Sequence, residues 1–134
     1  MTAHYLLVLV ALAAATAEAS PFSGIGRAID GDSLMVGQQE VRLFGIDAPE
    51  LNQTCTLRDK PWACGSRASE ELSRLITGKQ VACSSLGKDK HGRTLARCSV
   101  GATQLNRAMV LAGYALAFRR YSMEYISAED SARV

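Results

Sequence analysis

Short runs of apolar and β-branched residues dominate the first half of the sequence. They occupy residues 25–29, 33–36 and 40–46, and turn-type breaks at Asp30-Gly31 and at residues 37–39 separate them. Runs of this length between such turns predict a three-stranded antiparallel meander. Residues 47–63 hold two prolines and scattered polar residues, and are predicted to form a loop.

The second half mixes helical and strand patterns. Residues 66–76 place Ala68, Leu72, Leu75 and Ile76 on one helical face, and Gly78 follows as a C-cap. Two strands (79–86 and 94–100), a second helix (103–111) and a third helix (122–134, with Ser122 as cap and Glu124 in its first turn) are predicted to follow. This order indicates an α+β chain, and a partly open barrel of five strands fits it well.

The N-terminal residues 1–19 have the pattern of a signal peptide. An apolar run at residues 6–12 is too short to span a bilayer, and Ala17-Glu18-Ala19 resembles a cleavage site. The alternative is an N-terminal helix that belongs to the fold. We expect a mature domain of residues 20–134, secreted or periplasmic, with no membrane-spanning segment.

Four cysteines follow the predicted cleavage site: Cys55, Cys64, Cys83 and Cys98. An even number behind a signal peptide indicates two disulfides, for which three pairings exist. We favour Cys55–Cys64 across a loop and Cys83–Cys98 across a hairpin, because the second pair lies symmetrically about the predicted turn at residues 87–93. No C-x-x-C is present and His91 is the one histidine of residues 20–134, which disfavours a zinc site.

The charge pattern permits a polyanionic partner without requiring one. The whole chain carries a formal net charge of +2, and 11 of its 15 basic residues are Arg. The planar guanidinium group suits phosphate recognition, but many secreted proteins have a similar charge.

Asp32 begins one predicted strand, and Asp47 ends the strand that pairs with it. The hairpin should bring both carboxylates to one edge of the barrel. Two carboxylates without a nearby His or thiolate form a hard oxygen site for calcium or magnesium, and the carbonyl of Ala48, which precedes a proline, could be a third ligand. The alternative is that both aspartates merely occupy turns.

Three further charged residues suit phosphodiester hydrolysis. Glu50 could act as the base that activates water, or could be a solvated loop residue. Arg42 lies in an otherwise apolar strand, so it is expected either to contact a phosphate or to form a structural ion pair. Arg93 could contact the same phosphate or could be an exposed turn residue.

Residues 28–33, 41–50 and 89–93 resemble the three signature stretches of the staphylococcal nuclease (thermonuclease) family. The resemblance runs from about Gly26 to the C-terminus, and residues 61–65 are similar to a cysteine-bearing loop of its secreted bacterial branch. It implies a five-stranded OB-fold barrel with three helices, calcium at Asp32 and Asp47, and Glu50 as the general base. It also implies that Arg42 and Arg93 bind the scissile phosphate, and that the products carry 3′-phosphates.

The resemblance further implies substrate contacts from Lys90, His91, Arg119 and Tyr121. His91 stands where family members often carry Tyr, and Arg119 replaces the first of two family tyrosines, of which Tyr121 is the second. Arg119 could reach a neighbouring phosphate or could be an exposed charge at a helix edge. Family members usually continue the third helix to an apolar anchor, so ending at Arg133-Val134 leads us to expect a marginally stable domain.

We therefore expect a monomeric, secreted, calcium-dependent nuclease with DNA and RNA as substrates. The rival hypothesis is a non-catalytic module that binds nucleic acid or oligosaccharide, since barrels of this type commonly do so. An accessory role in polysaccharide assembly has no residue in its favour.

Overall fold

The computed structural model describes residues 20–120 and 122–133, so the predicted signal peptide, Tyr121 and Val134 lie outside the described residues. The strands are β1 (Ser20–Ala28), β2 (Ser33–Val36), β3 (Gln39–Leu43), β4 (Ile46–Asp47), β5 (Cys55–Leu57), β6 (Lys60–Trp62), β7 (Gln80–Lys88), β8 (Thr94–Val100), β9 (Thr103–Gln104) and β10 (Leu116–Ala117). The helices are α1 (Cys64–Ile76), α2 (Leu105–Leu111) and α3 (Ile126–Ala132).

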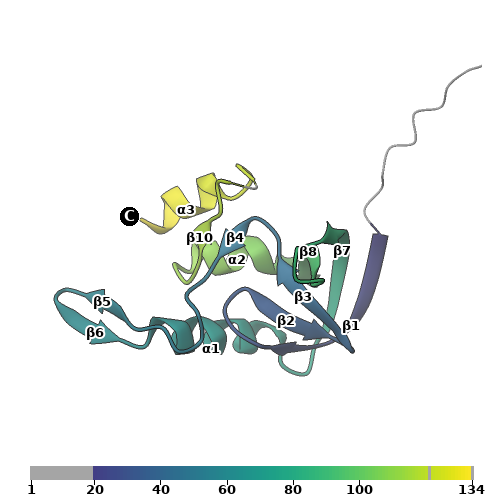
Figure 1. The fold of residues 1–134 in the computed structure, drawn as a ribbon, viewed down its shortest axis with the longest axis horizontal. Coiled ribbons are helices and arrows are strands. Elements are labelled where there is room, and N and C mark those ends of the chain that lie inside the picture. Colours follow the sequence, from purple (N-terminus) through teal and green to yellow (C-terminus); the bar gives the residue numbers. More distant parts are fainter. Residues whose placement is uncertain (1–19, 121, 134) are drawn as a thin grey trace, which may run out of the picture.

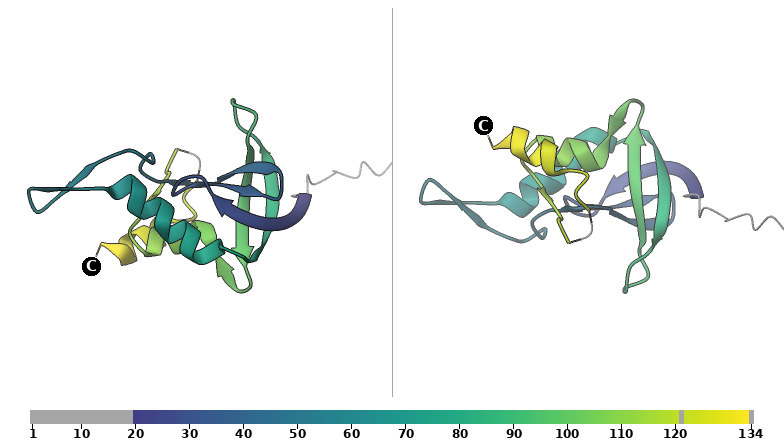
Figure 2. Two further views of the ribbon diagram at one scale, coloured as in Figure 1. Left: turned by 90° about the horizontal axis from the view of Figure 1, so that it is seen from below. Right: turned by 90° about the horizontal axis from the view of Figure 1, so that it is seen from above.

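Five of the strands form a closed barrel. They pair antiparallel in the order β3-β2-β1-β7-β8, and a parallel pairing between β3 and β8 closes the ring. Outside it, α2 lies between α1 and α3 and packs against both (Figure 1). The hairpin β5–β6 projects away from the barrel at the end where α1 begins, and the two views of Figure 2 agree on this. The predicted α+β barrel with three helices is therefore confirmed.

One apolar core joins the barrel to the helices. Its fully buried members include Leu34, Val41, Leu43, Leu72, Ile76, Leu105, Met109 and Val110. The predicted inner face of α1 is confirmed: Ala68, Leu72 and Ile76 have no exposed surface, and Leu75 is partly buried against the same cluster. In the part of the chain that the structure describes, no helix is both long and apolar enough to cross a membrane.

Two predictions for the first half are wrong. The strand predicted at residues 40–46 ends at Leu43, because the backbone turns at Gly45 with a φ of +78°; residues 46–47 form β4, which pairs with β10. The loop predicted at residues 47–63 contains the hairpin β5–β6. Its turn residues Arg58 and Asp59 have φ values of 51° and 63°, a geometry that sequences usually signal with Asn and Gly.

Two helices start later than predicted. Residues 103–104 pair with β8 as β9, so α2 begins at Leu105. The third helix begins at Ile126 rather than residue 122: the hydroxyl of Ser122 accepts a hydrogen bond from the Glu124 N–H at 3.0 Å and so caps a turn instead. Tyr125 is almost fully buried before the helix starts, because its ring packs against Gly45.

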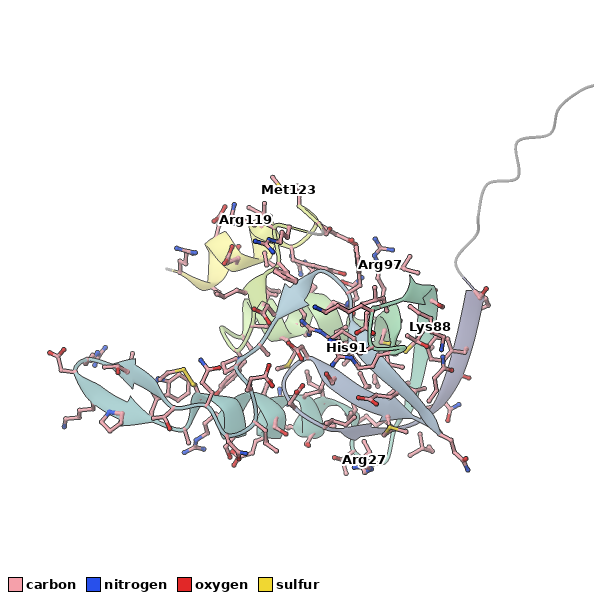
Figure 3. The ribbon with its side chains drawn as sticks, in the orientation of Figure 1. Arg27, Lys88, His91, Arg97, Arg119 and Met123 are labelled. Atoms are coloured by element: carbon pink, nitrogen blue, oxygen red, sulfur yellow. A yellow bond between two sulfur atoms is a disulfide. The ribbon has the colours of Figure 1, made fainter. Side chains whose placement is uncertain are left out.

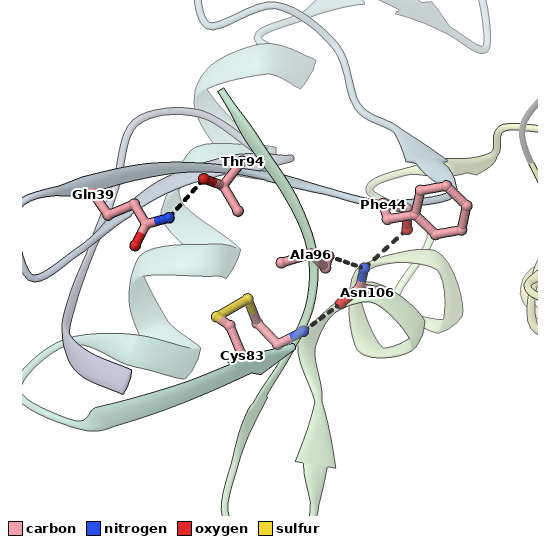
Figure 4. The surroundings of a disulfide bond; sticks show 7 residues. Gln39, Phe44, Cys83, Thr94, Ala96 and Asn106 are labelled. Atoms are coloured by element: carbon pink, nitrogen blue, oxygen red, sulfur yellow. Dashed lines mark hydrogen bonds between the residues drawn. A yellow bond between two sulfur atoms is a disulfide. The ribbon is translucent and has the colours of Figure 1, made fainter. Parts of the chain in front are cut away.

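Both favoured disulfides, Cys55–Cys64 and Cys83–Cys98, are present. Cys83 and Cys98 are directly opposite each other in the β7–β8 pair, with Cα atoms 4.1 Å apart, and the bond lies inside the barrel (Figure 4). Cys55–Cys64 instead joins the base of the projecting hairpin to the first residue of α1.

Candidate functional site

Arg42 is the centre of the predicted site. It lies on β3 opposite Ser33, and its side chain is only 15% exposed. One guanidinium nitrogen contacts the Asp32 carboxylate. The other lies 3.5 Å from Asp47 Oδ1 and donates a hydrogen bond to the Ile46 carbonyl at 3.2 Å. A single guanidinium group thus joins the two carboxylates that the sequence singled out.

The carboxylate of Asp32 is buried. Its Oδ2 accepts a hydrogen bond from the Ala48 N–H at 2.7 Å, and its Oδ1 accepts one from the Ser33 hydroxyl at 3.3 Å. Burial raises the pKa of Asp32 to about 7, although Arg42 and the Ala48 N–H act in the opposite direction. The negative form of this group therefore depends on the positive charge beside it.

The backbone brings Asp47 to this place by a different route from the one predicted. The Leu43 N–H donates to the Asp32 carbonyl at 2.8 Å, which ends the β2–β3 ladder before Asp47 is reached. The turn at Gly45 then redirects the chain into β4, and Asp47 pairs with Leu116 on β10. Asp47 is exposed, in contrast to Asp32.

The chemistry of these donors fits a hard divalent cation. Asp32 and Asp47 supply carboxylate oxygens that contact one guanidinium group, and the backbone of Ala48 is adjacent, because its N–H bonds to Asp32. Within residues 20–120 and 122–133, no cluster of three or more His, Cys, Asp or Glu side chains could hold a metal ion. A cation here would accordingly draw its remaining ligands from the backbone and from water or substrate.

A cavity of about 400 Å³ lies between the β3–β4 turn and the β7–β8 hairpin. Its polar lining comes from Arg42, Lys88, Asp89, Lys90, His91 and Arg93. Its apolar lining includes Leu43, Phe44, Ile46, Leu95 and Phe118. Four cationic side chains against one carboxylate make this cavity suitable for an anion with several oxygens, and its apolar wall could contact a sugar or a base.

Arg93 is held in place by Asp89. Its Nε donates to Asp89 Oδ2 at 2.8 Å, and its backbone N–H donates to Oδ1 at 2.9 Å. Desolvation acts to raise the pKa of Asp89, but hydrogen bonds from Arg93 and from the His91 N–H outweigh it and lower that pKa. Asp89 therefore stays charged and orders the turn that carries Arg93.

The four predicted substrate contacts do not share one location. Lys90 and His91 line the cavity on the β7–β8 hairpin, where Figure 3 also shows Lys88. Arg119 lies beside α3 in the same figure and pairs with the buried Glu129 at 2.9 Å, outside the cavity lining. Tyr121 lies outside the described residues.

Glu50 is exposed on the loop after β4 and does not line the cavity. Its backbone N–H donates to Gln53 Oε1 at 3.1 Å. The loop that carries Glu50 runs beside the first turn of α1, where the Glu50 carbonyl lies against Gly65. The Glu50 side chain is exposed to solvent.

Asn106 supports the site and was not anticipated. Fully buried on α2, it accepts a hydrogen bond from the Cys98 N–H at 3.0 Å and donates to the carbonyls of Phe44 and Ala96 at 2.9 and 3.1 Å (Figure 4). These bonds fix the β3–β4 turn that forms one wall of the cavity. A lone Asn in an apolar helix was the available signal. The position of Lys88 in the cavity lining was not predicted either, because Lys88 is the last residue of β7 and belongs to no recognisable motif.

Comparison with known proteins gives a consistent family match. A family model described as "Staphylococcal nuclease homologue" matches residues 40–134. An "Uncharacterized endonuclease" of Haemophilus influenzae is 33% identical over 96% of this chain and 70% of its own length.

Two further relatives match more of this chain than of themselves. "Succinoglycan biosynthesis protein ExoI" of Rhizobium meliloti is 29% identical over 73% of this chain and 53% of its own length. "Thermonuclease" of Staphylococcus hyicus is 34% identical over 74% of this chain and 61% of its own length. The chain thus spans less than two thirds of either of these proteins.

Proposed function

Because this chain belongs to the staphylococcal nuclease family, we propose that it is a secreted, calcium-dependent nuclease that hydrolyses phosphodiester bonds in DNA and RNA to 3′-phosphorylated products. Relatives named as an endonuclease and a thermonuclease support the nuclease class. The predicted signal peptide supports secretion.

One observation carries the proposal. Arg42 and Arg93, which lie far apart in the sequence, line the same cavity, and three further basic or imidazole side chains line it with them. A phosphodiester in this cavity would face both guanidinium groups, which can form paired hydrogen bonds with phosphate oxygens. The same groups would stabilise the negative charge that grows on these oxygens during hydrolysis.

The remaining steps are assigned to the carboxylates. Glu50 takes a proton from the attacking water, which approaches phosphorus in line with the leaving oxygen. Asp32, Asp47 and the Ala48 carbonyl would hold a calcium ion, which when bound supplies a Lewis acid to the phosphate oxygens. Arg42 lowers the pKa of Asp32 against the rise that burial causes, and so favours the charged carboxylate that binds a cation.

A second function is favoured by the position of Glu50. Its carboxylate does not line the cavity, as would suit a barrel that binds nucleic acid without cutting it. The two functions differ in whether the strand is broken.

End-labelled DNA and RNA incubated with the purified protein, in calcium or in chelator, distinguish these functions. We expect cleavage in calcium alone, and fragments whose mobility shifts after treatment with a 3′-phosphatase. Retention of intact strands on the protein without cleavage would support the binding module. Cleavage that leaves 3′-hydroxyl ends would contradict the proposed product.

A further inference from the structure

Glu50 is held by its backbone. Within residues 20–120 and 122–133 its side chain makes no hydrogen bond or ion pair that would fix its direction. Since the side chain is exposed and unpaired among the described residues, the backbone sets the place from which its carboxylate can reach. The groups that hold this backbone therefore decide which region the proposed base can reach.

Gln53 holds the backbone of Glu50 from both sides. Its side-chain Oε1 accepts a hydrogen bond from the Glu50 N–H at 3.1 Å. Its own N–H donates to the Glu50 carbonyl at 2.8 Å. Both polar groups of the Glu50 peptide units thus end on one residue.

Gln53 is in turn attached to α1. Its carbonyl accepts a hydrogen bond from the Gly65 N–H at 3.1 Å, and Cys64 Sγ lies 3.5 Å from the same oxygen. Amides in the first turn of a helix have no acceptor within the helix, so this bond satisfies one of them. The loop is therefore anchored to α1 through Gln53.

Close packing at Gly65 strengthens this attachment. A Cβ atom at this position would overlap the Glu50 carbonyl oxygen and would lie 2.7 Å from that of Leu51. Only glycine lets the loop approach the helix so closely. The Cys55–Cys64 disulfide closes the same connection, with Cys55 two residues after Gln53 and Cys64 one residue before Gly65.

We propose that Gln53 is a positioning residue, which fixes the general base Glu50 against the first turn of α1. The proposal rests on the function proposed above. Gln53 does not line the cavity of Arg42 and Arg93, although it lines a smaller cavity of about 310 Å³ with Asp47 and Ala48. We place its effect on catalysis in its bonds to Glu50. In the described part of the chain, its Oε1 is the side-chain group that holds the Glu50 N–H, so removing this acceptor should move the base away from its water.

The test is a double-mutant cycle between Gln53 and Glu50, measured as kcat and KM on a short oligonucleotide in calcium. Gln53→Met keeps the length of the side chain and removes the acceptor, whereas Gln53→Glu keeps an oxygen there. Gln80→Met is the matched control: Gln80 is also exposed, and its side chain also makes one hydrogen bond, in which Nε2 donates to the Ser23 hydroxyl at 3.3 Å on a distant strand. Circular dichroism checks that each variant folds. We expect the Gln53 variants to fold, because Gln53 is exposed.

Gln53→Met should lower kcat by about tenfold with KM unchanged, because a small misplacement of a catalytic group is costly. Gln53→Glu should restore most of this rate, and Gln80→Met should leave it intact. In a Glu50→Gln background Gln53→Met should lower kcat no further, since the base is already absent.

An equal fall of kcat in both backgrounds overturns the positioning role and leaves the nuclease function standing. So does an unchanged kcat in Gln53→Met, or an equal loss in Gln80→Met. Absence of cleavage by the wild-type protein overturns the proposed function, and the positioning role with it.

Discussion

The guanidinium group of Arg42 contacts the buried carboxylate of Asp32, which lies one residue before β2. The same group reaches Asp47 at 3.5 Å and forms part of the cavity wall. Arg42 therefore has two contacts of consequence: it compensates the charge of a buried carboxylate, and it presents positive charge to the cavity. An ion pair with an aspartate and a phosphate contact were alternatives in the sequence, and the fold makes them compatible.

Arg42→Lys should lower the cleavage rate by about 10² and the free energy of unfolding by about 2 kcal/mol, because one ammonium group cannot reach both carboxylates and the Ile46 carbonyl. Urea unfolding and initial rates measure the two effects. Arg74→Lys is the control: Arg74 also forms an ion pair, through two bonds to the single carboxylate of Glu71, but its side chain is exposed on α1, so the loss of stability should be much smaller. Equal losses in the two variants would contradict the special role of Arg42.

Asn106→Ala should lower the free energy of unfolding by about 3 kcal/mol, because it removes the side-chain partner of the Cys98 N–H and of the Phe44 carbonyl. The Ala96 carbonyl also loses this donor but keeps its bond from the Phe44 N–H. Gln80→Ala, which loses one exposed hydrogen bond, should lower it by less than about 1 kcal/mol. Urea titrations of both variants test the difference. A loss in Asn106→Ala no larger than in Gln80→Ala would show that the buried network contributes little.

Gly45→Ala should destabilise the protein more than Gly37→Ala. Both glycines have positive φ values, of +78° and +59°, so each substitution strains the backbone by about 1 kcal/mol. At Gly45 the new methyl group would also lie 2.9 Å from the Tyr125 ring, whereas at Gly37 it would meet nothing within 4 Å. Thermal melts of the two variants measure the packing contribution. Equal melting temperatures would mean that Tyr125 can move aside freely.

The barrel was predictable because its strands carry local signals. The boundaries of β2 and β8 were predicted to the residue, and α1 shows its buried face in the spacing of Ala68, Leu72 and Ile76. The elements that were missed depend on tertiary contacts. The start of α3 is set by the packing of the Tyr125 ring against Gly45, and no residue near Tyr125 in the sequence predicts this contact.

The site, too, was predictable only where local signals determine it. The order of the strands predicts that Asp32 and Asp47 lie close together, but it does not predict the bend at Gly45 that brings them there. The pairing of Arg119 with the buried Glu129 links residues ten positions apart across a turn, and periodicity does not reveal such a pair. Gln53 carries no motif at all, and its contacts with Glu50 and Gly65 became visible only in the folded chain.

Calcium should raise the free energy of unfolding by about 2.7 kcal/mol at a concentration 100 times its Kd, because only the folded chain gathers Asp32 and Asp47. Asp32→Asn should abolish this stabilisation. Asp59→Asn removes the same charge from the exposed tip of the β5–β6 hairpin and should retain it. Melts with calcium, magnesium and zinc make the comparison. Stabilisation by zinc but not by calcium would contradict the oxygen site.

The most direct test of the central claim compares cleavage and binding by the wild-type protein and Glu50→Gln. Gln keeps the size of Glu but cannot accept a proton, so the variant should cleave DNA in calcium about 10²–10⁴ times more slowly while binding it with unchanged affinity. Wild-type rates in Glu50→Gln would contradict the mechanism, and calcium-independent binding without cleavage by the wild-type protein would contradict the enzyme itself.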